Sequence, residues 1–167
     1  MINCMGMGLM RVLNRIILKI YNKEIKKELS ILMGIQLNDI NNILIRQCNE
    51  RSLNVKYISK CKSKIIVIIK KKNKVNLLLI HRGVAGTITD YDRFVDLYSK
   101  VNANKAFYIC TGVFQQDVYN KNYNLFLHKH IILVDGLSFL MKQKWFQLKE
   151  NGILDYDKLS FKKFFPR

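Results

Sequence analysis

The chain of 167 residues has the length of one domain, since domains usually run to about 100–200 residues. Hydrophobic residues make up 49% of the chain and charged residues 25%, a balance typical of globular proteins that excludes a disordered chain. There are 29 Lys and Arg against 12 Asp and Glu, a formal net charge of +17, and such a field attracts polyanions, above all nucleic acid. Compositional bias is the alternative explanation for this positive charge, because Lys, Asn and Ile are all abundant in the chain.

Cysteine and histidine do not follow a metal-binding pattern in this sequence. His128 and His130 are two positions apart without a third ligand nearby, which predicts no metal site. The longest apolar run, Ile65 to Ile69, is far shorter than the ~20 residues of a membrane-spanning helix. We therefore expect a cytoplasmic protein with reduced thiols. The four cysteines match neither a CxxC nor a Cys/His zinc spacing: Cys4, Cys48, Cys61 and Cys110.

The N-terminal third of the chain is basic and helical in its pattern. Residues 8–32 alternate apolar and basic side chains, which is typical of a solvated basic helix packed on its own domain and also of a membrane-surface helix. Residues 36–50 repeat apolar residues at helical spacing. We expect a basic helical N-terminal segment over 1–50, packed on a core over 51–150, and a C-terminal tail over 151–167.

The next part of the chain predicts β-structure. Val55 to Ser59 has the pattern of a short strand. Lys64 to Lys70 and Val75 to His81 contain apolar runs rich in branched side chains, and the lysine-rich stretch between them predicts a hairpin. The continuous apolar run of the first hairpin strand indicates that helices cover it on both faces.

Beyond the glycines at 83 and 86, strands and helices alternate. Thr89-x-x-Asp92 resembles a capping box, and Phe94 to Val101 has the apolar spacing of the helix that would follow it. Further elements are expected as strand 106–110, helix 114–121, strand 130–134 and helix 137–148. Because a strand–helix–strand unit gives a parallel pair, the whole order predicts an α/β fold with a mixed sheet flanked by helices.

Two segments of this region resemble a known family. They are Lys105 to Val118, a strand ending in Thr-Gly before a Phe that opens a helix, and Ile131 to Leu140, a strand followed by an Asp-Gly turn and a helix. Over Val55 to Leu140, about half of the chain, the sequence resembles the catalytic domain of Mrr-type restriction endonucleases in the PD-(D/E)xK nuclease superfamily. The resemblance implies a restriction-endonuclease-like fold.

The resemblance also implies where a catalytic signature belongs. The family carries an Asp in one hairpin strand and a Gln-x-Lys or Glu-x-Lys in the next, which hold a divalent metal and assist at the phosphate. The matching positions here are Ile66, Ile80 and Arg82, so the carboxylates are missing. Mg²⁺ prefers oxygen ligands. We therefore expect no metal cofactor and no catalytic residue at these positions, and a phosphate-binding role for Arg82.

The basic residues of the hairpin region are the expected nucleic-acid ligands. Residues 51–89 contain ten Lys or Arg and no Asp or Glu. The sequence predicts phosphate contacts, to DNA first and RNA as the alternative, from this set: Lys62, Lys64, Lys70, Lys71, Lys72, Lys74, His81 and Arg82.

Two other functions stay open at this stage. An active Mrr-like endonuclease would need Mg²⁺ and a displaced carboxylate such as Asp90, or metal-free chemistry by His81 with Tyr57 or Lys64. A basic protein-interaction or membrane-surface domain would use the helix at 8–27 instead. The sequence does not indicate a base preference or an oligomeric state.

Overall fold

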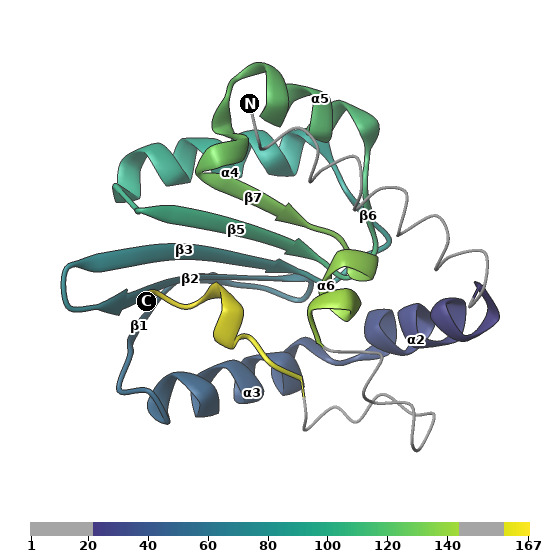
Figure 1. Cartoon of the computed structure of the whole chain (residues 1–167), viewed down its shortest axis with the longest axis horizontal. Coiled ribbons are helices and arrows are strands. Elements are labelled where there is room, and N and C mark those ends of the chain that lie inside the picture. The colour runs from purple at the N-terminus through teal and green to yellow at the C-terminus, as the bar shows by residue number, and fades with distance from the viewer. Residues whose placement is uncertain (1–21, 144–158) are drawn as a thin grey trace, which may run out of the picture.

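A computed structural model describes residues 22–143 and 159–167 (Figure 1). Five strands form one mixed sheet in the order β1-β2-β3-β5-β7. β1 is antiparallel to β2 and β2 to β3, whereas β3, β5 and β7 run parallel. The strands are β1 (Asn54–Lys60), β2 (Lys64–Lys71), β3 (Lys74–His81), β5 (Lys105–Cys110) and β7 (Ile131–Val134).

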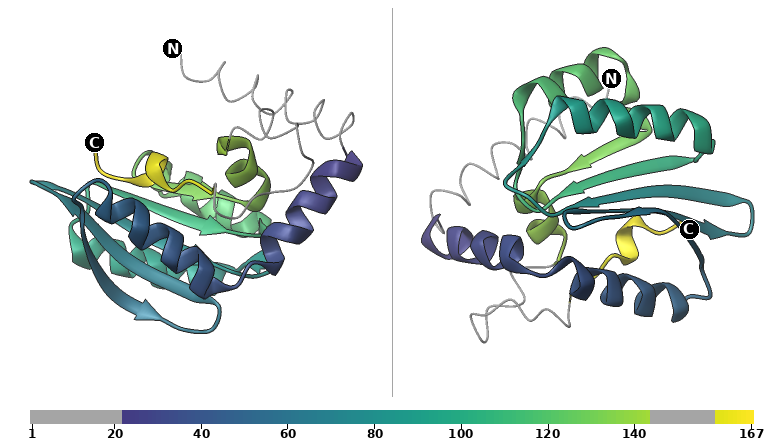
Figure 2. Two further views of the ribbon diagram at one scale, coloured as in Figure 1. Left: turned by 90° about the horizontal axis from the view of Figure 1, so that it is seen from below. Right: turned by 180° about the vertical axis from the view of Figure 1, so that it is seen from behind.

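Helices cover both faces of this sheet, so the expected α/β fold with a mixed sheet flanked by helices is confirmed (Figure 2). One face packs against α3 (Leu37–Asn49) and α6 (Gly136–Lys142). The other packs against α4 (Ile88–Val101) and α5 (Gln116–Asn124). The remaining elements are α2 (Asn22–Gly34), which packs on α6, the short strands β4 (Ala85–Gly86) and β6 (Val113–Phe114), and the 3-10 turns η1 (Leu127–Lys129) and η4 (Lys162–Phe164).

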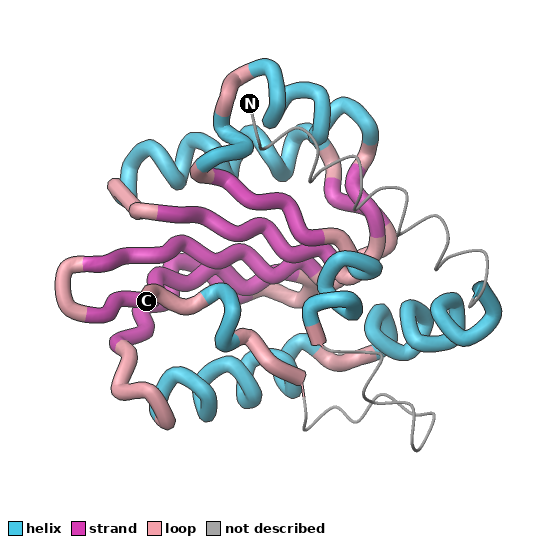
Figure 3. The backbone as a smooth tube through the Cα atoms, viewed as in Figure 1, coloured by secondary structure: helices cyan, strands magenta, loops and turns pink. Residues whose placement is uncertain are grey.

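Strand β2 shows why the hairpin lies inside the sheet. Ile65, Val67 and Ile69 have no exposed surface and enter the core beneath α3. Ile66 and Ile68 point to the opposite face and pack partly buried beside the α4 core. The predicted hairpin is confirmed in register, because Lys71 pairs with Lys74 across a two-residue turn. Lys72 in that turn has a φ of 51°, in the left-handed region that non-glycine residues rarely adopt. Figure 3 shows the turn projecting at the end of the molecule away from α2.

The predicted cap of helix α4 is wrong by two residues. Thr87 caps the helix, and its hydroxyl oxygen accepts the backbone N–H of Asp90 at 3.3 Å. Thr89 and Asp92, the predicted pair, lie inside the helix. Thr87-x-x-Asp90 and Thr89-x-x-Asp92 both have the sequence of a capping box. The short strand β4 ends at Gly86, directly before Thr87, so the helix begins after Thr87 rather than after Thr89.

The described end of the chain, residues 159–167, belongs to the core. Leu159, Phe161 and Phe164 are almost fully buried against the face that carries α3. The buried side chain of Gln47 fastens this segment, because its Oε1 accepts the backbone N–H of Phe161 at 2.8 Å and its Nε2 donates to the carbonyl of Leu159.

Two predicted regions lie partly outside the described residues. The basic helix expected at 8–32 is described only from residue 22, as α2, and the helix expected at 137–148 only to residue 143. None of the helices that the structure describes combines the length and the apolar character needed to cross a bilayer.

Candidate functional site at the hairpin and the ends of the parallel strands

Four side chains meet where β2 begins and where β3 and β5 end: Lys64, His81, Asp90 and Tyr108, here called the polar cluster. Lys64 and His81 are direct register partners, so they leave the sheet on the same face. Asp90 comes from the first turn of α4. Ligands of open α/β sheets usually bind at the carboxyl ends of parallel strands, which is where the cluster lies.

One ion pair and one hydrogen bond lie within this cluster, and its members are close neighbours. Lys64 Nζ lies 2.5 Å from Asp90 Oδ1, and His81 Nδ1 lies 4.0 Å from Asp90 Oδ2. The same nitrogen, His81 Nδ1, lies 3.0 Å from the hydroxyl oxygen of Tyr108. The exposed fractions of the Lys64 and Asp90 side chains are 26% and 15%, so the pair is largely withdrawn from water.

Burial and charge determine the protonation states of the cluster. Burial lowers the pKa of His81 below its usual value and the Lys64 ammonium lowers it further, against the opposing pull of Asp90. Burial also raises the pKa of Tyr108 well above its ordinary range. For Asp90, burial tends to raise the pKa, but the hydrogen bond and charge of Lys64 outweigh this effect, so the pKa is lowered. At neutral pH the cluster therefore holds a neutral imidazole, a neutral phenol and one ion pair.

The loops after β3 and β5 are hydrogen-bonded to each other. Gly83 donates its backbone N–H to Thr111 Oγ1 at 3.1 Å, and Val113 donates to the carbonyl of Val84 at 2.9 Å. Gly112 is required at this contact, because a Cβ there would lie 2.0 Å from the carbonyl oxygen of Val84. Burial raises the pKa of the neighbouring Cys110 thiol to about 11, so it is a protonated, inert thiol at neutral pH.

The family-matched positions lie on different sides of the sheet. Ile80 is 1% exposed, pairs in register with Ile65 and faces the core beneath α3, away from His81. Ile66 lies on the α4 face. Arg82 follows the end of β3, where its Nε donates to the carbonyl of Met33 at 3.2 Å. Within residues 22–143 and 159–167, no group of three or more His, Cys, Asp or Glu could hold a metal ion.

The eight predicted nucleic-acid ligands fall into three groups. Lys64 and His81 belong to the polar cluster. Lys62 and Arg82 line a small pocket of about 290 Å³ with the first turn of α3. The third group is the exposed hairpin tip, defined as Lys70, Lys71, Lys72 and Lys74. The tip and the polar cluster lie at opposite ends of an eight-residue strand, about 23 Å apart.

Sequence reasoning missed Tyr108 and chose Tyr57 as a partner for His81. Tyr57 lies on edge strand β1 and its hydroxyl donates to Oδ1 of Asn41 on α3, at 2.5 Å. Tyr108 was detectable in principle, because Ala106, Tyr108 and Cys110 alternate along β5 and so share one face. Whether His81 of β3 lies on the same face of the sheet as Tyr108 depends on the parallel register of β3 and β5.

Comparisons with known proteins add a fold-level likeness. No family model matches the sequence, and no curated protein matches it. Among solved structures, a protein of unknown function, AF1548, is similar at a TM-score of 0.39 and 10% identity, over 58% of this chain and 57% of that one. The MspJI restriction endonuclease, solved with a 27-mer oligonucleotide, is similar at a TM-score of 0.37 and 13% identity. That likeness covers 89% of this chain but only 34% of MspJI.

Proposed function

We propose that this protein binds DNA through its phosphates, along the basic hairpin of β2 and β3, without metal-dependent cleavage. The observation that carries the proposal is the hairpin tip. Lys70, Lys71, Lys72 and Lys74 are all exposed, and none of them pairs with a carboxylate in the part of the chain that the structure describes. Unpaired cations gathered on a projecting turn attract a phosphate backbone and release its counterions.

The surrounding strands support the same proposal. Edge strand β1 is exposed along nearly its whole length and carries Lys56 and Lys60. Together with Arg82 and Lys62 at the far end of β3, these residues extend positive charge along the hairpin, and the acid-free stretch of 51–89 supplies no competing carboxylate. RNA shares the phosphate chemistry and remains the alternative partner.

The absence of cleavage is supported by the chemistry of the polar cluster. Mg²⁺ needs oxygen ligands, and Asp90 is the one carboxylate of the cluster. Its Oδ1 already accepts a charge-assisted hydrogen bond from Lys64, so a metal that bound this oxygen would have to displace an ammonium group. We therefore propose a degenerate relative of Mrr-type nucleases rather than an active endonuclease, with no metal cofactor.

The test is DNA retardation at increasing salt with a charge-matched control. We expect Lys71→Gln/Lys72→Gln to weaken duplex binding and to reduce the slope of log affinity against log salt by about 0.9 for each lost phosphate contact. The control is Lys26→Gln/Lys27→Gln, two exposed lysines on α2 at the opposite end of the molecule (Figure 1). Equal effects of the two double variants, or an affinity that does not change with salt, would contradict the proposal.

A further inference from the structure

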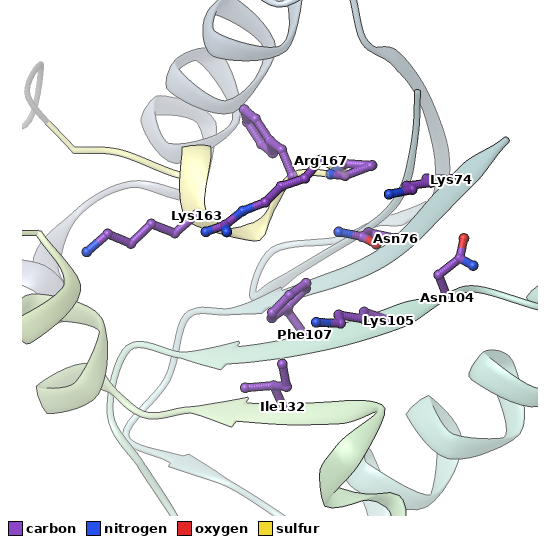
Figure 4. A pocket seen from close by; sticks show the side chains of 10 residues that line it. Lys74, Asn76, Asn104, Lys105, Phe107, Ile132, Lys163 and Arg167 are labelled. Carbon is purple, nitrogen blue, oxygen red and sulfur yellow. The ribbon is translucent and has the colours of Figure 1, made fainter. Parts of the chain in front are cut away.

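A second basic feature lies beside the hairpin tip, as a pocket of about 500 Å³ (Figure 4). Its floor is the amino end of the parallel strands, where Asn76 of β3, Phe107 of β5 and Ile132 of β7 share the face toward α3. Its opposite wall is the C-terminal segment, including Phe165 and Arg167. The pocket is thus at the other end of the sheet from the polar cluster.

Cations converge on this pocket, and its lining residues include no Asp or Glu. Lys74 and Lys105 extend their ammonium groups from the sheet, and the guanidinium of Arg167 lies across from them (Figure 4). Lys163 turns away, because its Nζ donates to the carbonyl of Lys142 at 2.8 Å. The first three have no carboxylate partner among the described residues, so they repel one another until an anion is present.

The walls of the pocket are held by hydrogen bonds before any ligand binds. Asn76 Nδ2 donates to the carbonyl of Phe164 at 2.9 Å, which fixes the C-terminal segment against β3. Val75 donates its backbone N–H to Asn104 Oδ1 at 2.7 Å, and Asn104 donates its own to the carbonyl of Val75 at 2.8 Å. These bonds leave the Nδ2 group of Asn104 as a donor at the rim. A preformed pocket loses less conformational entropy on binding.

The floor adds an apolar surface that a bare phosphate would not use. Ile132 is partly exposed on this floor, and Phe107 beside it keeps 7% of its surface exposed because it packs edge-on against Phe164, with ring centroids 5.3 Å apart. A volume of about 500 Å³ lies within the usual range of small-ligand sites, roughly 300–1,000 Å³. An anionic group and a flat apolar group joined in one molecule would satisfy both parts of the pocket.

We propose that this pocket binds a nucleoside phosphate. The phosphate lies between Lys74, Lys105 and Arg167, where a guanidinium fork suits phosphate oxygens. The base lies on the apolar floor that Ile132 and Phe107 form. The ligand is either a free nucleotide or the phosphorylated end of a nucleic-acid strand, which share this chemistry. If the ligand is the end of a strand, this inference rests on the proposed DNA binding, because Lys74 belongs to both the hairpin tip and the pocket.

The experiment is calorimetric titration at low salt without metal, with five probes: ADP, pyrophosphate, adenosine, a short single strand with a 5′-phosphate, and the same strand without it. We expect ADP or the phosphorylated strand to bind at least about tenfold more tightly than pyrophosphate and adenosine, because only they reach both parts of the pocket. Tighter binding of ADP than of the phosphorylated strand assigns a free nucleotide, and the reverse assigns a strand end.

The variant Lys105→Gln/Arg167→Gln, at two exposed positions, should weaken this binding roughly tenfold to a hundredfold. Lys26→Gln/Lys27→Gln is the charge-matched control and should leave it unchanged. Equal binding of pyrophosphate and ADP, or equal effects of the two double variants, would overturn the inference. Nucleotide binding by a protein that fails to retard duplex DNA would overturn the proposed function alone, so the two failures are distinguishable.

Discussion

Lys64 and Asp90 form an ion pair with their nitrogen and oxygen 2.5 Å apart, and this pair joins the first residue of β2 to the first turn of α4. Asp90 donates its backbone N–H to the capping Thr87 at the same time. The carboxylate that the fold brings to the end of β3 is therefore engaged in holding a helix to the sheet. The pair gives a structural explanation for a carboxylate at this place.

Asp90→Asn should destabilise the fold by about 1–2 kcal/mol at pH 7, between the values of exposed and buried ion pairs. Because Lys64 lowers the pKa of Asp90 in the folded state, the stabilisation is complete above the unfolded pKa of about 3.9 and is lost as pH falls through the lower folded value. Urea unfolding at pH 7 and near pH 3 would measure this. Asp92→Asn, which breaks an exposed pair with Lys121, is the control, and an equal loss would contradict the assignment.

His81 should make stability depend on pH in a different window. Its folded pKa is lowered, chiefly by burial, so the unfolded chain binds the proton more readily below about pH 6.5. Stability should therefore fall as pH drops from about 6.5 towards the lower folded pKa. His81→Gln should flatten this part of the pH profile in chemical unfolding. A profile unchanged between pH 8 and pH 5 would show that His81 is free to protonate in the folded state.

A carboxylate introduced at Ile80, the position that the proposed resemblance to Mrr-type nucleases assigns to one, should unfold the protein rather than create cleavage. Ile80 is 1% exposed in the core beneath α3, where a carboxylate would have no partner. We expect Ile80→Glu to lose at least about 3 kcal/mol of unfolding free energy, measured by urea titration. The control Ile80→Val should lose only about 1 kcal/mol. A stable Ile80→Glu protein that cuts DNA with Mg²⁺ would reverse our interpretation of the register.

Arg82→Ala should weaken DNA binding while nicking activity stays at background. Arg82 lies beside Lys62 at the first turn of α3, so we expect one phosphate contact to be lost, together with the hydrogen bond to Met33. Plasmid retardation and nicking with Mn²⁺, the more permissive ion, would be read in one experiment. If the wild-type protein nicks the plasmid and Asp90→Ala abolishes that nicking, the polar cluster is an active site and the degenerate-nuclease proposal fails.

Local patterns in the sequence were sufficient to predict the α/β class and the hairpin of β2 and β3. These rest on local rules, since the continuous apolar run of Ile65 to Ile69 and the lysine-rich turn depend on neighbours only a few residues away. The same rules allowed two caps for α4 and gave no element for residues 159–167. The latter enter the core through hydrogen bonds to Gln47, more than a hundred residues earlier in the chain.

Which polar residues contact one another depends on the three-dimensional arrangement of the strands and helices. His81 meets Tyr108 rather than Tyr57 because parallel pairing of β3 with β5 puts their alternating side chains on one face. Asp90 reaches Lys64 because α4 begins beside the end of β3. The basic pocket joins Lys74, Lys105 and Arg167, which are far apart in sequence. Such contacts depend on strand order and register, and these emerge from packing the whole chain rather than from any local pattern.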